Sequence, residues 1–218
     1  MKRFSVLFAG LLMSSVAALP AGATVLFQQS AANTSAWTSE TSHGTNGFNQ
    51  VWDNFTLASP GNVTTVSWTG WVLPSFGQLN GFTISFYNDD IVDGSHVPGT
   101  LISSKTISGN ANEVGVGSHN SYGIFDFSAA VPFAAAANTQ YWISIVGDPQ
   151  SSTFNWANSN GMDSSFYEDD GNGTVGPVGT DVAFTLSNTS VPEPGSLTLA
   201  GTGVLGLAGM ARRRFAKR

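Results

Sequence analysis

The chain has 218 residues, of which 41% are hydrophobic and 11% aromatic, and it contains no cysteine. This composition excludes an intrinsically disordered chain, because 15 Phe, 6 Trp and 4 Tyr are enough to build a sizeable core. The lack of thiols also excludes a disulfide scaffold and a thiolate metal site. Only 10% of the residues are charged, against about a quarter in an average globular chain.

The charged residues are distributed unevenly along the chain. Lys105 is the only Lys or Arg between residues 24 and 190, and this stretch holds every acidic residue except Glu193. The other basic residues lie at the two ends. Nucleic acids and anionic lipid surfaces are bound through clustered Lys and Arg, so the sequence excludes both as partners of residues 24–190.

Residues 1–23 have the order of a secretory signal peptide. Lys2 and Arg3 form a basic start, residues 4–19 are uncharged and mostly apolar, and Ala21 and Ala23 form an A-x-A cleavage site. We therefore expect export, with cleavage after Ala23. An uncleaved membrane anchor is the alternative, although the apolar run is short for a bilayer span.

Residues 24–190 are expected to form one secreted domain rich in β-strands. Residues 24–50 are mostly polar and irregular in pattern, so we expect a loosely attached segment there. Later runs alternate apolar and polar residues with a period of two, which is typical of strands with one buried face. These runs are 65–69, 82–87, 125–127, 141–145 and 182–186.

Turn-forming residues separate the strand-like runs, and no stretch between them has a convincing helical period. The turns are expected at Pro60-Gly61-Asn62, Asp93-Gly94-Ser95, Pro98-Gly99 and Gly171-Asn172-Gly173. About eight to ten strands without an internal repeat indicate an antiparallel β-sandwich rather than a propeller or β-helix. The predicted fold class is therefore all-β, with a jelly roll as one arrangement of the sandwich.

Two acidic loops are candidate cation sites. The first loop contains Asp89, Asp90 and Asp93, which follow a predicted strand. Hard oxygen ligands on flexible loops suit Ca²⁺ better than a transition metal. The alternative is an ordinary solvated turn, because Asp, Asn and Gly favour turns for conformational reasons.

The second loop has the start of an EF-hand spacing. Glu168, Asp170 and Asn172 occupy positions that correspond to 1, 3 and 5 of such a loop. The twelfth position has no carboxylate, so Asp163 or Asp181 would have to complete the ligand shell. A solvated acidic turn is again the alternative.

The tryptophans are candidate sugar-stacking residues. Trp68 is in phase with the apolar residues of its run and is expected in the core, whereas Trp71 and Trp142 are out of phase. An exposed ring on the outer face of a sandwich can stack on the apolar face of a sugar, but burial is the ordinary outcome for aromatic residues. Three further tryptophans lie near loop-like segments, namely Trp37, Trp52 and Trp156.

The sequence does not indicate a catalytic site. The histidines are scattered, and neither a G-x-S-x-G elbow nor an H-E-x-x-H motif is present. A carboxylate pair for glycoside hydrolysis would be recognised only by its separation in space. We therefore expect a protein that is not an enzyme.

Residues 191–218 contain three segments in a fixed order. Pro192 and Pro194 disfavour regular structure, so the first segment is expected to be an extended hinge. Residues 196–211 carry no charge and are expected to form a short apolar helix, which is marginal in length for a membrane span. Residues 212–218 form a basic stop that would stay on the cytoplasmic side.

This order of Val-Pro-Glu-Pro-Gly-Ser, a Gly/Ala/Leu-rich helix and three arginines resembles the PEP-CTERM sorting signal of Gram-negative bacteria. The resemblance implies recognition by an exosortase, removal of the tail near Pro192 and Pro194, and transient anchoring in the inner membrane. It further implies release or attachment at the cell surface, in the company of exopolysaccharide and biofilm matrix. Residues 24–190 resemble the sandwich domains of such proteins only in style, so no functional residue is carried over.

The sequence therefore predicts an exported cell-surface or extracellular-matrix protein with a structural or adhesive role. A carbohydrate-binding module, assisted by Ca²⁺, is the second hypothesis, and a polysaccharide-active enzyme is the third. The expected partners are an exosortase at the C-terminal signal and an exopolysaccharide. Contact with the membrane is expected only through the C-terminal helix before processing.

Overall fold

The computed structural model describes residues 23–43, 47–73, 79–150, 152–161, 163–170 and 174–189. These residues contain fifteen strands and no helix, which confirms the prediction of an all-β protein. Within these ranges no helix is long and apolar enough to cross a membrane. The predicted signal peptide and the predicted C-terminal apolar helix lie outside the described residues.

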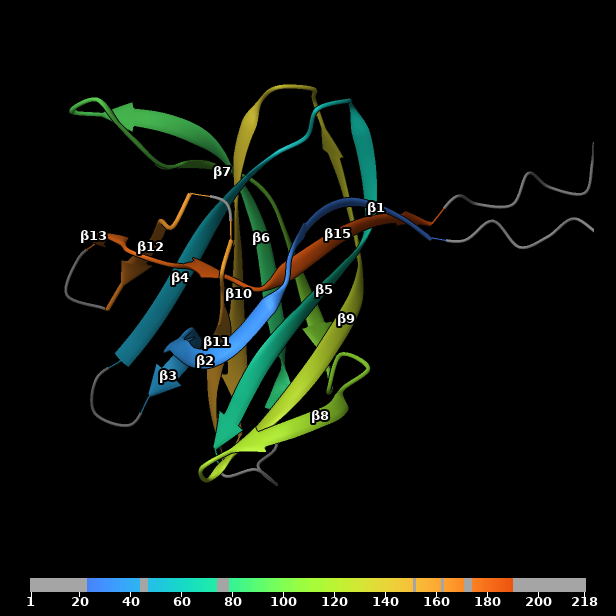
Figure 1. Cartoon of the computed structure of the whole chain (residues 1–218), viewed down its shortest axis with the longest axis vertical. Helices are drawn as coiled ribbons and strands as arrows, with labels where there is room; N and C mark the ends of the chain where they lie inside the picture. Colours follow the sequence, from blue (N-terminus) through green and yellow to red (C-terminus); the bar gives the residue numbers. More distant parts are fainter. Residues whose placement is uncertain are drawn as a thin grey trace, which may run out of the picture. The chain divides into compact units, whose positions relative to one another are not determined.

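The strands form two sheets (Figure 1). The described part of the first sheet contains β1 (Ala23–Gln29), β2 (Ala31–Thr38), β5 (Gly61–Leu73), β8 (Val114–His119), β9 (Tyr122–Ala135), β11 (Thr153–Ser159), β14 (Asp181–Val182) and β15 (Phe184–Thr189). The strand order is β1-β15-β5-β11-β14, with β2 beside β11. On its other side β5 pairs with β9, which in turn pairs with β8.

The second sheet faces the first across the core. Its described strands are β3 (Glu40–His43), β4 (Gly47–Thr56), β6 (Leu79–Val92), β7 (Ser95–Ser108), β10 (Gln140–Pro149), β12 (Phe166–Asp169) and β13 (Thr174–Val178). Their order is β13-β12-β4-β3-β10-β6-β7. The pairings between named strands are antiparallel except for one parallel contact between β3 and β10.

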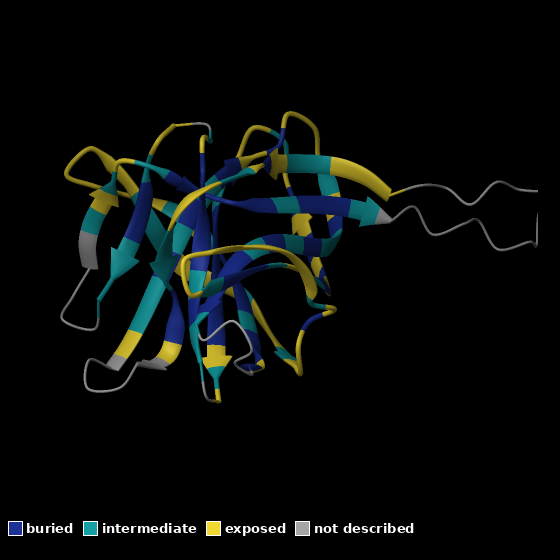
Figure 2. Ribbon diagram, turned by 60° about the horizontal axis from the view of Figure 1, so that its bottom comes forward, coloured by how far each residue is buried: buried dark blue, intermediate teal, exposed yellow. Residues whose placement is uncertain are grey.

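The core is built from the inward positions of the alternating runs (Figure 2). On β6 the inward side chains of Phe82, Ile84 and Phe86 are almost completely buried, as the alternation predicts. Trp68 of β5 packs edge-on against Phe82 across the two sheets, with ring centroids 4.9 Å apart. Each such side chain contributes about 1.5–3 kcal/mol by leaving water. The two sheets therefore form a sandwich around one aromatic-rich core.

The expectation of a loosely attached segment at residues 24–50 is wrong for the residues that the structure describes there. β1 pairs with β15, and β2 pairs with β11. The polar residues of β2 are compatible with pairing because side chains satisfy its backbone. The side-chain oxygen of Asn158 accepts hydrogen bonds from the backbone N–H groups of Thr34 and Ser35 at 3.2 and 3.0 Å. Backbone pairing between strands and hydrogen bonds to an amide side chain do not need an apolar pattern. The period-two alternation of apolar residues therefore did not predict strands in this segment.

One predicted turn is also wrong. Pro98 and Gly99 lie inside β7 rather than between strands, at an irregular stretch of its ladder with β6. A side chain at Gly99 would lie within 2.9 Å of the Asn88 carbonyl oxygen, so the glycine permits a close backbone approach. The turn predicted at Asp93 and Gly94 is confirmed, because both residues have positive φ and connect β6 to β7.

Candidate functional site

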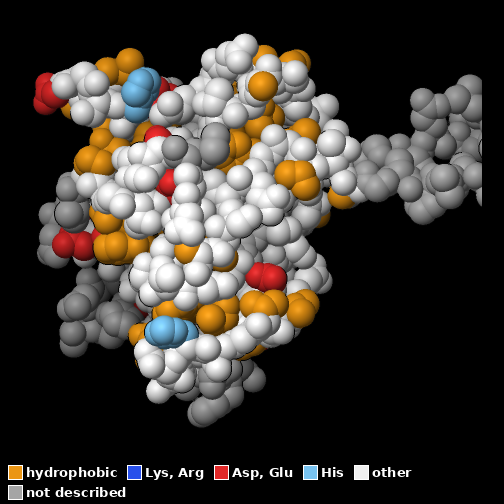
Figure 3. Space-filling model, viewed as in Figure 1, with side chains coloured by type: hydrophobic (Ala, Val, Ile, Leu, Met, Phe, Trp, Pro, Cys, Tyr) orange, Lys and Arg blue, Asp and Glu red, His pale blue; other side chains and the backbone are white. Residues whose placement is uncertain are grey.

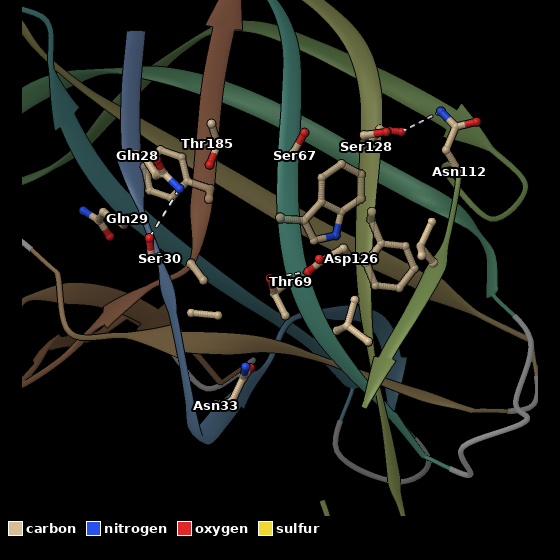
Figure 4. Close-up of a pocket in the computed structure, with 17 residues that line it drawn as sticks. Gln28, Gln29, Ser30, Asn33, Ser67, Thr69, Asn112, Asp126, Ser128 and Thr185 are labelled. Carbon is tan, nitrogen blue, oxygen red and sulfur yellow. Dashed lines mark hydrogen bonds between the residues drawn. The ribbon is translucent and has the colours of Figure 1, made fainter. Parts of the chain in front are cut away.

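A polar groove of about 570 Å³ lies on the outer face of the first sheet (Figure 4). Its floor is formed by β15, β5 and β9, and its two sides by β1 and β8 with their adjoining loops. The floor is hollow because the outward residues at this place are small. Ser67 and Thr69 alternate with core residues of β5, and Ser128 does the same on β9.

Four of the groove side chains form a continuous row across four strands. Gln28 on β1 is opposite Thr185 on β15, Thr185 is opposite Ser67 on β5, and Ser67 is opposite Ser128 on β9. Asn112 extends the row, because its amide donates to the Ser128 carbonyl at 3.1 Å. Figure 4 shows these five side chains side by side along the groove. The row brings together residues that are far apart in sequence.

Among the described residues, the only acidic side chain that lines the groove is Asp126, which lies in a second, shorter row. Asp126 is opposite Thr69 of β5, and its carboxylate accepts a hydrogen bond from the Thr69 hydroxyl at 2.7 Å. On its other side Asp126 is opposite Val114 of β8. Val114 and Val116 are 59% and 51% exposed, so one wall of the groove is apolar and open to solvent.

A small apolar cluster closes one end of this outer face. Trp71, Ile124, Ala157 and Ala183 are buried there. The Trp71 ring also stacks on His119, with centroids 4.9 Å apart and planes 29° apart. Of the two outcomes open for Trp71, burial is the one found, because Ala31 and Ala36 of β2 pack against this cluster and His119 at the end of β8 stacks on the ring. The hydroxyl-lined groove begins where this cover ends.

The outer face of the second sheet is filled instead of hollow. Trp142 of β10 is only 1% exposed, so the hypothesis that its ring stacks on a sugar is wrong and the ordinary alternative, burial, is the outcome. Its ring packs edge-on against Tyr167 of β12, with centroids 5.3 Å apart. Its indole N–H donates to the Asp89 carboxylate at 2.9 Å. Of the other predicted stacking residues, Trp156 is completely buried, and Trp37 and Trp52 are partly buried.

The first acidic loop does not gather its three carboxylates. Asp89 accepts bonds from Trp142, from the Gln140 amide at 3.1 Å and from His96 at 2.5 Å, so it ties the β6–β7 hairpin to β10. Asp90 instead accepts the N–H of the residue that follows it. Asp93 lies in the hairpin turn. Successive strand residues point to opposite faces, which separates Asp89 from Asp90.

The second acidic loop is only partly described. Partial burial raises the pKa of Glu168, and repulsion from Asp170 raises it further. Asn172 lies outside the described residues. Asp163 and Asp181 belong to a different cluster. Asp181 accepts hydrogen bonds from two backbone N–H groups, and its carboxyl is hydrogen-bonded to that of Asp163. Within the ranges that the structure covers, no three acidic or histidine side chains are grouped to hold a metal ion.

Sequence patterns missed a cluster of three carboxyl groups that adjoins the core. Asp53 of β4 is completely buried and Asp181 of β14 is 1% exposed. Asp53 accepts the Val182 N–H at 2.8 Å, and the Gln29 amide, with its nitrogen toward this carboxyl, donates at 2.9 Å. Burial, together with repulsion from Asp181, holds the pKa of Asp53 well above its ordinary value. Asp53 is therefore protonated in the folded protein over a wider pH range than an exposed carboxyl.

Asp163 completes this carboxyl cluster. Burial raises the pKa of Asp181, and a hydrogen bond between its carboxyl and that of Asp163 raises it further. The backbone N–H groups of Ser164 and Ser165 donate to Asp181 at 3.1 and 3.0 Å. A side chain at Gly161 would lie 2.3 Å from an Asp181 oxygen, so the loop approaches the carboxyl closely. Through these bonds to Ser164 and Ser165, Asp181 holds the loop after β11 against the strands.

The two described histidine side chains have structural contacts. His96 bonds to Asp89, and His119 stacks on Trp71. The side chain of His43 lies outside what the structure describes.

The described side chains of the groove offer hydrogen bonding by hydroxyl groups, amide groups and a single carboxylate, next to an apolar wall.

The fold and the groove define an all-β, two-sheet protein with a polar groove on the outer face of one sheet. A family model of the PEP-CTERM protein-sorting motif matches residues 190–214, which confirms the resemblance seen in the C-terminal sequence. The chain thus carries this motif, which indicates an exported protein that an exosortase sorts through a transient stay at the membrane. No curated protein and no solved structure matches the chain.

Proposed function

We propose that the exported body of this protein is a non-catalytic adhesive component of the extracellular matrix. The observation that carries the proposal is the groove on the first sheet, which is rich in hydroxyl and amide groups and has no Lys or Arg among the described residues that line it. Such a surface suits a polyhydroxylated matrix, because each hydroxyl can both donate and accept a hydrogen bond. The PEP-CTERM motif supports the same location, since it directs the chain out of the cytoplasm.

The charge distribution also supports a role in adhesion outside the cell. Only Lys105 opposes the acidic residues of residues 24–190, and its ammonium group donates to the Ala130 carbonyl at 2.7 Å. A surface with one base does not attract polyanions such as nucleic acids. Proteins at the cell surface that hold neutral polymers do not need such bases.

A Ca²⁺-assisted form of this function places the ion at Glu168 and Asp170. Partial burial and, to a smaller extent, repulsion from Asp170 raise the pKa of Glu168, and a bound cation would relieve this repulsion. A polysaccharide-active enzyme is the least supported function, because the described acids with raised pKa values are not in the groove.

The experiment is fractionation of the producing cells into cell, matrix and medium. The full chain is compared with an unrelated exported carrier protein that ends in residues 190–218, which has the same tail without the body. We expect the full chain to be enriched in the matrix fraction relative to the carrier. Equal distribution of the two proteins would show that the body contributes no adhesion.

A further inference from the structure

We propose that the groove binds one chain of a neutral, linear polysaccharide, which lies across the strands with about one sugar unit per strand. The inference rests on the proposed adhesive function and adds to it the ligand class, the binding residues and the direction of the bound chain. It follows from three features of the groove: the spacing of its polar row, its charge and its apolar wall.

The spacing of the row sets the repeat of the ligand. Neighbouring strands lie about 4.7–4.9 Å apart, so the outward side chains of Gln28, Thr185, Ser67 and Ser128 recur at that interval. This interval is close to the length of one pyranose unit along an extended glycan. A linear chain laid along the row therefore presents hydroxyl groups to successive strands in register.

The hydroxyl and amide groups of the row are available for hydrogen bonds to a ligand. No side-chain hydrogen bond joins the hydroxyls of Ser67, Thr185 or Ser128 to another of the described residues. The Gln28 amide makes only a 3.3 Å contact with Ser30. Strand pairing fixes the backbone that carries these groups, and the short Ser and Thr side chains lose little conformational entropy when a ligand binds to them. The row thus supplies donors and acceptors at fixed positions, as a polymer of hydroxyl groups requires.

The charge of the groove selects a neutral chain. Asp126 is the only charged side chain among the described residues that line the groove, and the Thr69 hydroxyl already donates to one of its oxygens. Polyanionic glycans would find no base there and would be repelled by the acidic body. A polycationic glycan carries charge on each unit, whereas the groove has one carboxylate for its whole length. Figure 3 shows a face of the protein on which no Lys or Arg side chain is visible among the described residues.

The wall on β8 suits the apolar faces of sugar rings. Val114 and Val116 are more than half exposed next to the row, although aliphatic side chains are usually buried. C–H groups on the face of a pyranose ring can cover them while the ring hydroxyls reach the floor. Asn112 stands at the same side and is held by its bond to the Ser128 carbonyl. The groove therefore combines a polar floor with a fixed apolar side.

The test is equilibrium binding of the full-length protein, purified in mild detergent, to soluble neutral, anionic and cationic polysaccharides. Ser67→Arg fills the middle of the row, and Gln28→Ala removes one end of it with little risk to folding. Thr106→Arg is the matched control, because it places the same side chain at an exposed position on β7 of the other sheet. Thermal melts of each variant show whether it is folded.

We expect saturable binding of a neutral glycan that changes little with salt. Ser67→Arg should weaken it about tenfold or more and Gln28→Ala about two- to fivefold, as expected from the loss of individual hydrogen bonds. Thr106→Arg should bind like the wild type. Binding only to charged glycans, or neutral binding that folded Ser67→Arg retains, would overturn the inference. So would absence of glycan binding in a protein that is still enriched in the matrix, and that result would leave the adhesive function standing.

Discussion

The outer faces of the two sheets are built by the same strand alternation but differ in what covers them. On the first sheet, Ser67, Ser128 and Thr185 leave a hollow that is open to solvent (Figure 4). On the second sheet, Trp142 and Tyr167 fill the corresponding layer. The difference teaches that alternation determines which side chains point outward, whereas their size determines whether the outer face becomes a groove or a second packed layer.

The carboxylates on these two faces differ in the same way. Asp89, on the filled face, accepts bonds from an indole, an amide and a histidine, so it holds the structure together. Asp126, on the open face, has the Thr69 hydroxyl as its hydrogen-bond donor among the described side chains. An acidic residue in the sequence is therefore not evidence of a binding site until its neighbours are known.

The largest effect is expected from the filled face. Trp142→Ala should lower the free energy of unfolding by about 3–5 kcal/mol, because it leaves a large cavity beside Tyr167. Trp142→Phe should cost about 1–3 kcal/mol, since it keeps a ring but removes the N–H that donates to Asp89. Ser67→Ala on the open face should change stability by less than about 0.5 kcal/mol. Urea unfolding measures all three, and similar losses for Trp142→Ala and Ser67→Ala would remove the distinction between the faces.

The carboxyl cluster adjoining the core provides a third environment to set beside the two faces. Because burial raises the folded-state pKa of Asp53 and Asp181, their contribution to stability is fully present below the unfolded value of 3.8. It is lost as the pH rises through the raised values, and each unit of difference changes stability by about 1.4 kcal/mol. We therefore expect the melting temperature to fall from pH 4 toward neutral pH.

Asp163→Asn provides the control for this pH dependence. It removes a negative charge that raises the pKa of both Asp53 and Asp181, while its amide can still donate to the Asp181 carboxyl. The decline in stability should become shallower in this variant. A wild-type melting temperature that rises between pH 4 and pH 8 would contradict the account of the cluster.

The smallest effect is expected from calcium. If Glu168 and Asp170 hold Ca²⁺ weakly, a calcium concentration a few times the dissociation constant should add about 1 kcal/mol of stability. In a chain of this size that corresponds to about 2–4 °C in melting temperature. Glu168→Gln should abolish the shift, whereas Asp90→Asn should not, because Asp89 and Asp90 are not brought together. Identical wild-type melts in calcium and in chelator would discard the calcium-assisted form.

Much of the fold was predictable from local pattern. The runs around Val66, Ile84 and Ile143 alternate with a period of two, and each of these residues is buried in the core. The pairing of β2 was not predictable, because this strand lacks an alternating apolar pattern. Its backbone N–H groups donate instead to the side chain of Asn158, which is distant in sequence. Trp71 and Trp142 had the correct phase for an outer face, but their cover comes from residues distant in sequence.

The groove could be predicted only in part. The outward positions of Ser67 and Thr185 follow from the same alternation that places their neighbours in the core. That Gln28, Thr185, Ser67 and Ser128 share one row depends on the register between strands up to 157 residues apart, which no local pattern encodes. The carboxyl cluster was missed for the same reason, because Asp53 and Asp181 come from distant strands.

The most direct test of the central claim is a map of amide NMR shifts as a neutral oligosaccharide is added to the protein. The account predicts that the shifts that change are those of Gln28, Ser67, Asn112, Ser128 and Thr185. Shifts that change mainly around Trp52, Tyr87 and Trp142 would place the binding surface on the second sheet and contradict the assignment of the groove.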